Sequence, residues 1–180
     1  MSLVLAVLAV GVVLGWLAGG SVSRLGDLPL RSRRLVVAAL LTQLAGALLG
    51  GPLYPVGLLV SAGLVMAFLT RNRRLAGAPL VALGLLLNAL VVGGNGAMPV
   101  SVTAAARAGV PLTGLVDGPR HELADPRTRL SWLGDVVPVP LPVRAEVVSP
   151  GDVLVAAGLA QLVVAGMLRR RRVLLTVGAR

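Results

Sequence analysis

The chain has 180 residues, of which 56% are hydrophobic and 13% are charged, and its mean hydropathy is +0.90. Because about a quarter of the residues of an average soluble domain are charged, this composition predicts an integral membrane protein and argues against a soluble one. Cysteine is absent and histidine occurs once, which excludes disulfides, thiolate chemistry and a metal site built from cysteines or several histidines. The residues therefore indicate no metal and no cofactor.

The net charge of +10 comes from 17 basic residues, all of them arginine, against 7 acidic ones. Such an excess is typical of proteins that neutralise nucleic-acid phosphates. Most of these arginines, however, flank apolar stretches, where they orient and anchor membrane helices. The predicted partner is accordingly the lipid bilayer and not a nucleic acid.

Five apolar stretches are long enough to cross a bilayer as helices, since a crossing needs about 20 residues and shorter stretches are tolerated when the bilayer adapts. They cover residues 3–19, 35–51, 53–70, 75–92 and 153–168. We therefore predict an all-α integral membrane bundle of five transmembrane helices, forming a single membrane domain over residues 1–180. Residues 93–152 form one long extracytoplasmic loop. A cleavable signal peptide at residues 3–19 is the alternative, but no positive segment precedes that stretch.

The arginines also predict an orientation. With five crossings, twelve arginines and Asp27 fall on one side of the bilayer, whereas the other side holds five arginines and six acidic residues. Cytoplasmic loops carry the excess of arginine. This places the N-terminus outside and the C-terminus in the cytoplasm of a bacterial cell.

Glycines at positions 11, 15 and 19 share one face of the first predicted helix. Small residues at this spacing let helix backbones approach closely. We interpret the ridge as packing against another span of the same chain, with a homo-oligomer or a membrane protein partner as the alternative.

Three amides lie within the predicted spans: Gln43, Asn88 and Gln161. An amide in hydrocarbon is unfavourable unless it finds a hydrogen-bond partner. We therefore expect all three to face the bundle.

The loop contains its own local signals. Glycines at 93, 94 and 96 predict a turn with positive φ, residues 101–108 predict a short helix at the membrane interface, and residues 117–129 are interpreted as solvated loop. Residues 136–143 alternate proline with apolar residues, which indicates an extended segment. Ser149 or Asp152 can cap the last helix, where a negative charge suits the positive helix end.

Asp135 and Asp152 are the candidate catalytic residues. Two carboxylates in a partly dry site can share a proton and activate water, because close like charges raise one pKa. The alternative is that Asp135 ends a turn and Asp152 only caps the helix. Asn95 is a candidate for orienting a substrate or partner, or else it satisfies its own turn, and Met98 and Ser149 complete the candidate binding residues.

Three motifs carry a resemblance. They are Asn-Gly-Ala-Met-Pro-Val at 95–100, Leu-Gly-Asp at 133–135 followed by prolines, and Ser-Pro-Gly-Asp at 149–152. On these motifs the chain resembles an uncharacterised family of bacterial multi-pass membrane proteins, a domain of unknown function. The resemblance covers nearly the whole chain and implies no activity.

A second likeness is to lipoprotein signal peptidase, an intramembrane aspartic protease. The Asn-Gly-Ala at 95–97 is similar to its Asn-x-Gly motif, and the likeness implies that Asp135 and Asp152 are the catalytic pair. The Gly-Asn-x-x-Asp-Arg motif of that family is not present in this sequence.

Two functions follow as expectations. In the first, which we favour, the protein is a non-enzymatic membrane component whose outer loop binds a partner protein, a lipid or a small molecule. In the second, Asp135 and Asp152 form the dyad of an intramembrane hydrolase, and Asn95 positions the substrate. Whether the chain is an enzyme stays open at this point.

Overall fold

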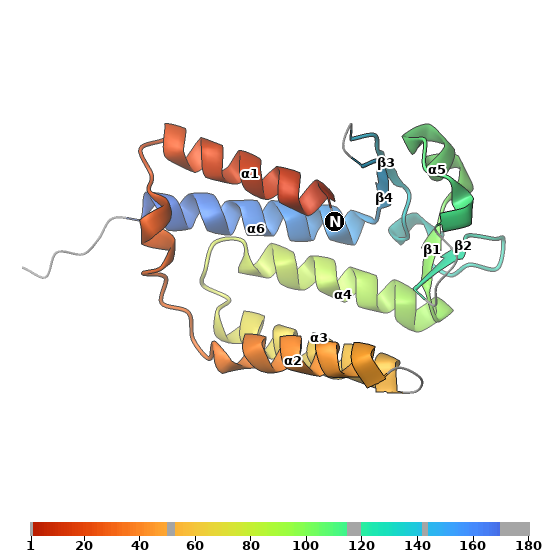
Figure 1. Ribbon diagram of the computed structural model, residues 1–180, viewed down its shortest axis with the longest axis horizontal. Coiled ribbons are helices and arrows are strands. Elements are labelled where there is room, and N and C mark those ends of the chain that lie inside the picture. The colour runs from red at the N-terminus through yellow and green to blue at the C-terminus, as the bar shows by residue number, and fades with distance from the viewer. Residues whose placement is uncertain (1, 50–52, 115–119, 142–143, 170–180) are drawn as a thin grey trace, which may run out of the picture.

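The computed structural model describes residues 2–49, 53–114, 120–141 and 144–169, and within them the chain is mostly helical. Five long helices lie beside one another, and a unit of short helices and strands covers one end of them (Figure 1). The long helices are α1 (Ser2–Leu17), α2 (Arg34–Leu49), α3 (Leu53–Arg71), α4 (Ala78–Asn95) and α6 (Pro150–Leu168). A 3-10 helix, η1 (Val22–Leu25), follows α1.

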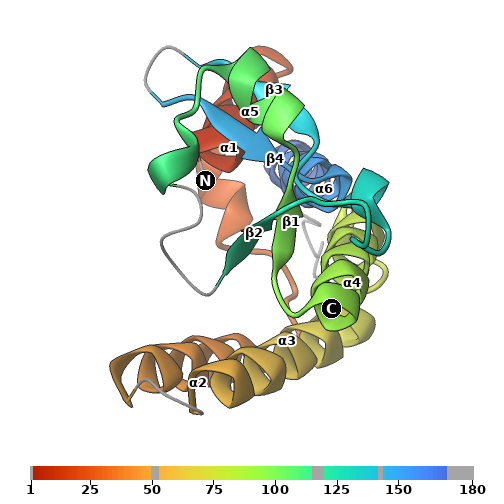
Figure 2. The ribbon, with the colours of Figure 1, turned by 90° about the vertical axis from the view of Figure 1, so that its right-hand side faces the viewer.

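The long helices form two layers. In the first layer α6 lies between α1 and α4 and packs against both (Figures 1 and 2). In the second, α2 and α3 form an antiparallel hairpin, which contacts the first layer through α3 and α4. Leu69 of α3 joins Ala78 and Val81 of α4 in a buried cluster, and Val155 and Leu159 of α6 pack against it. This cluster ties the hairpin to the rest of the bundle.

Glycines allow the helices of the first layer to approach closely. A Cβ at Gly11 would lie 3.4 Å from Ala160 Cα, and a Cβ at Gly15 would lie 2.7 Å from the sulfur of Met167, both on α6. The predicted packing of the glycine ridge within the chain is therefore confirmed for these two positions. It is wrong for Gly19, which lies beyond the end of α1 and has no atom within 4 Å of a Cβ built on it.

Each predicted span overlaps one of the five long helices, with ends that differ by a few residues. Two helices, α4 with 18 residues and α6 with 19, are long and apolar enough to cross a membrane by length and composition. Among the residues whose side chains the structure describes, shorter apolar stretches of 10–17 residues lie in the other three long helices, at Ser2–Leu17, Arg34–Gly46 and Leu59–Arg71. Of the predicted all-α bundle, the predominance of helix is confirmed, but four short strands are also present. The five crossings stay a prediction.

The unit at the end of the bundle, residues 96–149, is called the cap unit below (Figure 2). It contains strands β1 (Met98–Val100), β2 (His121–Leu123), β3 (Val137–Val139) and β4 (Glu146–Val148), helix α5 (Val102–Ala108), and the 3-10 helices η2 (Leu112–Gly114) and η3 (Ser131–Leu133). β1 pairs in parallel with β2, and β3 pairs antiparallel with β4. Its small core consists of buried side chains from β1, α5 and β4: Val100, Ala104, Ala105, Ala108 and Val147.

The cap unit is more ordered than the sequence suggested. The short helix expected at 101–108 and the extended segment expected near 137 are both present. The interpretation of residues 117–129 as loop throughout is wrong, because His121–Leu123 is the strand that pairs with β1. Residues 115–119 and 142–143 lie outside the described residues.

The expected turn after α4 is confirmed at Gly96. Its φ of 90° lies in the left-handed region, and its N–H caps the helix by donating to Val92 O. The expectation that the three amides face the bundle holds only for Asn88, which is half-buried against α6. Gln43 and Gln161 are exposed.

The two ends of the bundle differ in what holds them together. At the cap end, Glu146 accepts hydrogen bonds from the N–H groups of Ser2 and Leu3 and so fixes the start of α1. At the other end, Ser21 N–H and the Arg24 guanidinium both donate to Met167 O near the end of α6. The chain runs back and forth between these ends, so η1 and the loop between α3 and α4 lie far from the cap unit (Figure 1).

Candidate functional site at the start of α6

The first turn of α6 carries Ser149 and Asp152 in a capping box. Ser149 is the N-cap residue, and its Oγ accepts from Asp152 N–H at 2.9 Å. In return Asp152 Oδ2 accepts from Ser149 N–H at 3.3 Å. A serine and an acidic residue three positions apart satisfy two otherwise free backbone donors, and the carboxylate lies at the positive end of the helix. The predicted capping role is confirmed for both residues.

Asn88 of α4 connects this cap to the neighbouring helix. Its Nδ2 donates to Asp152 Oδ1 at 2.8 Å, and its Oδ1 accepts from Ser149 Oγ at 2.8 Å. The two helices are close enough for this because Gly151 has no side chain, and a Cβ there would overlap the Asn88 amide. The Asn88 amide, which would be unfavourable in an apolar helix without partners, therefore has a hydrogen bond at both its oxygen and its nitrogen.

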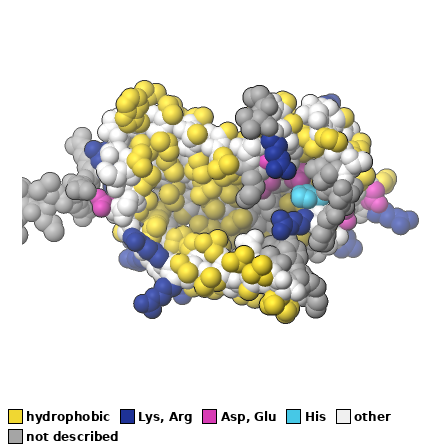
Figure 3. Space-filling model, viewed as in Figure 1, with side chains coloured by type: hydrophobic (Ala, Val, Ile, Leu, Met, Phe, Trp, Pro, Cys, Tyr) yellow, Lys and Arg dark blue, Asp and Glu magenta, His cyan; other side chains and the backbone are white. Residues whose placement is uncertain are grey.

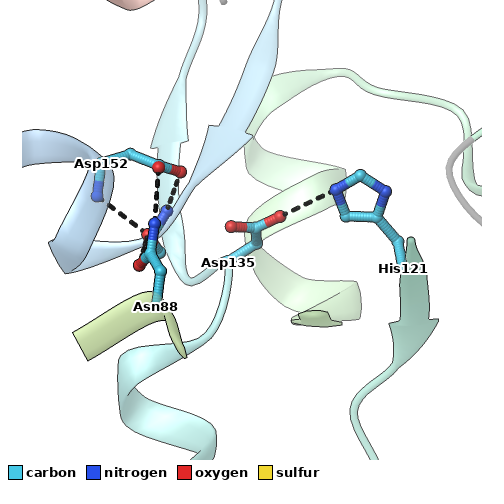
Figure 4. A network of polar contacts seen from close by, with 5 residues as sticks. Asn88, His121, Asp135 and Asp152 are labelled. Atoms are coloured by element: carbon cyan, nitrogen blue, oxygen red, sulfur yellow. Dashed lines mark hydrogen bonds and ion pairs between the residues drawn. The ribbon is translucent and has the colours of Figure 1, made fainter. Parts of the chain in front are cut away.

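Asp135 approaches the same place from the cap unit. It follows η3, and its backbone is held by β1, because Asp135 N–H donates to Pro99 O at 2.8 Å and Ser101 N–H donates to Asp135 O at 2.9 Å. The residue is only 5% exposed. Its Oδ2 lies 3.6 Å from Nε2 of His121 on β2. Figure 4 shows the Asp135 carboxyl group between His121 on one side and the pair formed by Asp152 and Asn88 on the other.

Electrostatics favour the uncharged forms of Asp135 and His121. Burial raises the pKa of Asp135 to about 7, and the negative charge of Asp152 acts in the same direction. Burial lowers the pKa of His121, with Arg120 acting in the same direction and Asp152 opposing. A simple ion pair would shift the two pKa values the other way, so burial outweighs the 3.6 Å contact. Near neutral pH the Asp135 carboxyl group is therefore poised to gain or lose a proton.

The candidate residues named from the sequence fall into two groups: Asp135, Ser149 and Asp152 lie near the start of α6, whereas Met98 and Asn95 lie in β1 and at the end of α4. Ser149 and Asp152 lie together, and Figure 4 places Asp135 beside them, joined to Asp152 by no hydrogen bond. Their action as a catalytic dyad stays a prediction. Met98 is in β1, where it pairs with His121 in the backbone register and is half-buried.

Asn95 is used elsewhere. Its Nδ2 donates to Val91 O at 2.8 Å and to Arg129 O at 2.9 Å, and its Oδ1 accepts from Arg129 N–H at 2.8 Å. The side chain therefore pins the loop at Arg129 to the end of α4. Asn95 also lines a small cleft of about 260 Å³, whose charged side chains are those of Glu122, Asp125, Arg127 and Arg129.

Asn88 and His121 are the members of the site that sequence reasoning did not assign to it. Asn88 had a signal, since it is a polar residue in an apolar helix and needed a partner. His121 had none, because its position depends on the pairing of β1 and β2. Among the described residues, no group of three or more histidine or acidic side chains is arranged to hold a metal ion.

Comparison with known proteins gives one match. The model of a family of unknown function, DUF5317, matches residues 27–164, which is well over half of the chain and includes the cap unit, Asn88 and Asp152. The chain belongs to this family, as the resemblance to an uncharacterised family predicted. No curated protein and no solved structure matches it.

Proposed function

We propose that this member of the DUF5317 family is a multi-pass protein of the bacterial cell membrane that crosses the bilayer five times. In this proposal the cap unit lies outside the cell and binds a partner protein, a lipid or a small molecule without catalysing a reaction. The observation that supports it most directly is the separation of charge along the bundle. The arginines near η1 and between α3 and α4 lie at the end opposite the cap unit, as the positive-inside rule requires of a cytoplasmic face.

The surface of the helices supports a lipid environment. Large apolar side chains are exposed along every long helix, among them Leu5, Trp16, Leu48, Leu59 and Leu86. Figure 3 shows hydrophobic side chains covering much of the helical part of the molecule, with charged side chains toward the two ends. An apolar surface of this extent is unfavourable in water and is suited to hydrocarbon. The helices shorter than 18 residues require local thinning of the bilayer.

The absence of cysteine from the sequence makes the orientation simple to test. Single cysteines are introduced as Arg127→Cys in the cap unit and Arg73→Cys at the opposite end, both at exposed positions. A membrane-impermeant maleimide applied to intact cells should label the first variant and should label the second only after lysis. Labelling of both variants in intact cells would contradict the five-crossing arrangement.

The proposed binding by the cap unit requires a separate experiment. A photoreactive side chain placed at Arg127, which lines the small cleft beside Asn95, should give a discrete crosslinked product in native membranes. The matched control is the same side chain at Arg34, exposed at the other end of the bundle. The same set of products from both positions, or no product from Arg127, would argue against a binding role for the cap unit.

The second candidate function is an intramembrane aspartic-type hydrolase. The specific observation in its favour is the buried Asp135 carboxyl group, whose pKa of about 7 reflects burial and the neighbouring charge of Asp152. A carboxylic acid beside a carboxylate is the arrangement that activates water in aspartic proteases. Neither aspartate lines the small cleft beside Asn95 or the larger cleft at the opposite end of the bundle, between the end of α3 and the last turns of α6, which is why we place this candidate second.

Turnover of membrane-embedded peptides by the purified protein tests the hydrolase. Asp135→Asn and Asp152→Asn should each abolish cleavage, whereas Asp125→Asn in an exposed turn should leave it unchanged. Circular dichroism of each variant controls for loss of the capping box. An experimental structure with the two carboxyl groups more than roughly 10 Å apart would remove this candidate, because one water could not bridge them.

A further inference from the structure

The end of the bundle opposite the cap unit contains a large basic cleft. Its volume is about 920 Å³, and its walls come from the segment before α2, the end of α3 with the loop that follows, and the last turns of α6. Five arginines line it: Arg31, Arg71, Arg73, Arg74 and Arg169. No acidic side chain is among its lining residues. In the part of the chain that the structure describes, no ion pair joins any of the five to a carboxylate.

A buried asparagine fixes the shape of this cleft. Asn72, at the end of α3, is 4% exposed. Its Oδ1 accepts from Arg31 N–H at 2.9 Å, and its Nδ2 donates to Arg31 O at 2.9 Å and to Phe68 O at 2.8 Å. The backbone at Arg31 is thereby fastened to α3 although 41 residues separate the two positions. Arginines from three separate chain segments are held around one space in the folded protein.

Positive charges that converge without a counter-charge repel one another, and an anion in the cleft removes this repulsion. Guanidinium groups also match phosphate oxygens with paired hydrogen bonds. We propose that this cleft binds a phosphate-bearing anion. The ligand chemistry is shared by the head group of an anionic phospholipid and by a soluble phosphate compound. Basic clefts between helices on the cytoplasmic side are a known setting for anionic head groups.

The proposal goes beyond the function proposed for the cap unit and does not depend on it. Its lipid form depends on the helices lying in a bilayer, whereas its soluble form does not. Two probes distinguish these sources: phosphatidylglycerol supplied in nanodiscs of phosphatidylcholine, and pyrophosphate added to the protein in neutral detergent. Native mass spectrometry measures retained lipid, and thermal unfolding measures stabilisation by pyrophosphate.

The test variant is the double substitution Arg71→Gln and Arg74→Gln, which removes two charges from the cleft wall. The control is Arg34→Gln, which removes a charge at the same end from a residue that does not line the cleft and leaves the hydrogen bond from Arg33 to Leu28 O in the cleft wall intact. At about 1 kcal/mol for each basic residue, the test variant should bind the effective probe about 30-fold more weakly. The control should retain the affinity of the unmodified protein.

Each outcome decides the proposal. Selective retention of phosphatidylglycerol that is lost in the test variant identifies a lipid site, and stabilisation by pyrophosphate with the same loss identifies a soluble ligand. Equal retention of both lipids without any effect of pyrophosphate would overturn the proposal. Equal losses in the test and control variants would also overturn it, since they would indicate a general surface charge. The test variant must keep the helical circular dichroism of the unmodified protein, and Arg71→Lys with Arg74→Lys provides a charge-preserving second variant that should keep measurable binding.

Discussion

The two ends of the bundle manage their charges in opposite ways. At the cap end, the carboxylates of Asp135, Glu146 and Asp152 are at least half-buried, and each has a partner within the chain. At the opposite end, Arg71, Arg73 and Arg74 are exposed, and they surround a cleft that contains no acidic lining residue. These three carboxylates have their partners within the chain itself. The arginines that line the cleft, in our proposal, take their counter-charge from a bound anion.

This difference predicts different sensitivities. Buried groups whose pKa values are shifted toward neutrality respond to pH, and they are little affected by salt because counter-ions do not reach them. Exposed arginines respond to salt, since the screening length shortens as ionic strength rises. Measurements of stability against pH therefore report on the cap end, and measurements of anion binding against salt report on the arginine end.

The largest expected effect comes from breaking the contact between α4 and α6, which connects the two ends. A Cβ at Gly158 of α6 would lie 2.7 Å from Gly77 O and 2.7 Å from a methyl group of Val81. Because a backbone oxygen cannot move aside, Gly158→Val should lower the free energy of unfolding by about 3 to 5 kcal/mol. Thermal unfolding in detergent measures this loss of stability. Gly63→Val in α3 is the control, since nothing lies within 4 Å of a Cβ there, and equal stability of the two variants would show that the contact is not tight.

The second effect concerns the proton on Asp135. Burial raises its pKa to about 7 from 3.8, so the folded state holds this proton over a range of pH in which the unfolded state has released it. The stability that the protonated form contributes is complete below about pH 4 and is lost as pH rises through about 7. Asp135→Asn removes this loss and should raise the free energy of unfolding at about pH 8 by up to about 4 kcal/mol. Chemical unfolding at a series of pH values measures the effect.

A substitution at His121 distinguishes the pH dependence contributed by Asp135 from that contributed by its neighbour. Its pKa is lowered by burial, so its contribution has the opposite sign: stability is lost as pH falls through the ordinary histidine value of 6.5. His121→Gln should therefore make the decline of stability with rising pH steeper than in the unmodified protein. If Asp135→Asn retains the full pH dependence, the carboxyl group that titrates near neutrality is a different one.

The third effect tests the link between the cap of α6 and α4. Asn88→Leu removes the donor to Asp152 and the acceptor for Ser149, so two polar groups at the start of α6 lose a partner. Leaving buried polar groups unpaired should lower the free energy of unfolding by about 2 kcal/mol. Gln161→Leu, at an exposed position of α6, is the matched amide control and should change stability little. A comparable loss in both variants would mean that apolar contact, and not the hydrogen bonds, determines the effect.

The parts of this fold that were predictable are those encoded locally. Helices follow from apolar runs bounded by arginine, glycine or proline, and the cap of α6 follows from serine and aspartate three residues apart. The partners of these groups were not predictable. Asn88 meets Asp152 across 64 residues, and β1 meets β2 through three pairs whose strands are too short to show a periodicity. His121 therefore carried no signal, although it contacts the most strongly shifted carboxyl group of the site.

The exposed amides show a second limit. Gln43 and Gln161 were expected to face the bundle because an amide is unfavourable in lipid, yet both are on its surface. The physical argument concerns only the need for a partner, and it does not specify whether that partner belongs to the same chain. In the same way, the arginines indicated an orientation from their order along the chain. The cleft that five of them share could be found only from the fold, because the contact that fastens Arg31 to Asn72 spans 41 residues.

The smallest expected effect lies where the cap unit meets α1. Burial alone would raise the pKa of Glu146, but hydrogen bonds donated at the start of α1 outweigh it and lower the pKa to about 2. Its contribution to stability is therefore present above about pH 4.5 and is lost as pH falls toward about 2. Glu146→Gln keeps an oxygen acceptor but removes the charge, and because solvent screens this site the free energy of unfolding should fall by only about 1 kcal/mol or less.

Hydrogen exchange gives the local measurement: the amides of Ser2 and Leu3 should exchange faster in this variant and at an unchanged rate in Glu122→Gln, since Glu122 lies on β2. Unchanged exchange in both variants would mean that the start of α1 is held by its packing on α6 and by the hydrogen bond from Ser2 Oγ to Arg144 O, and not by the Glu146 carboxylate.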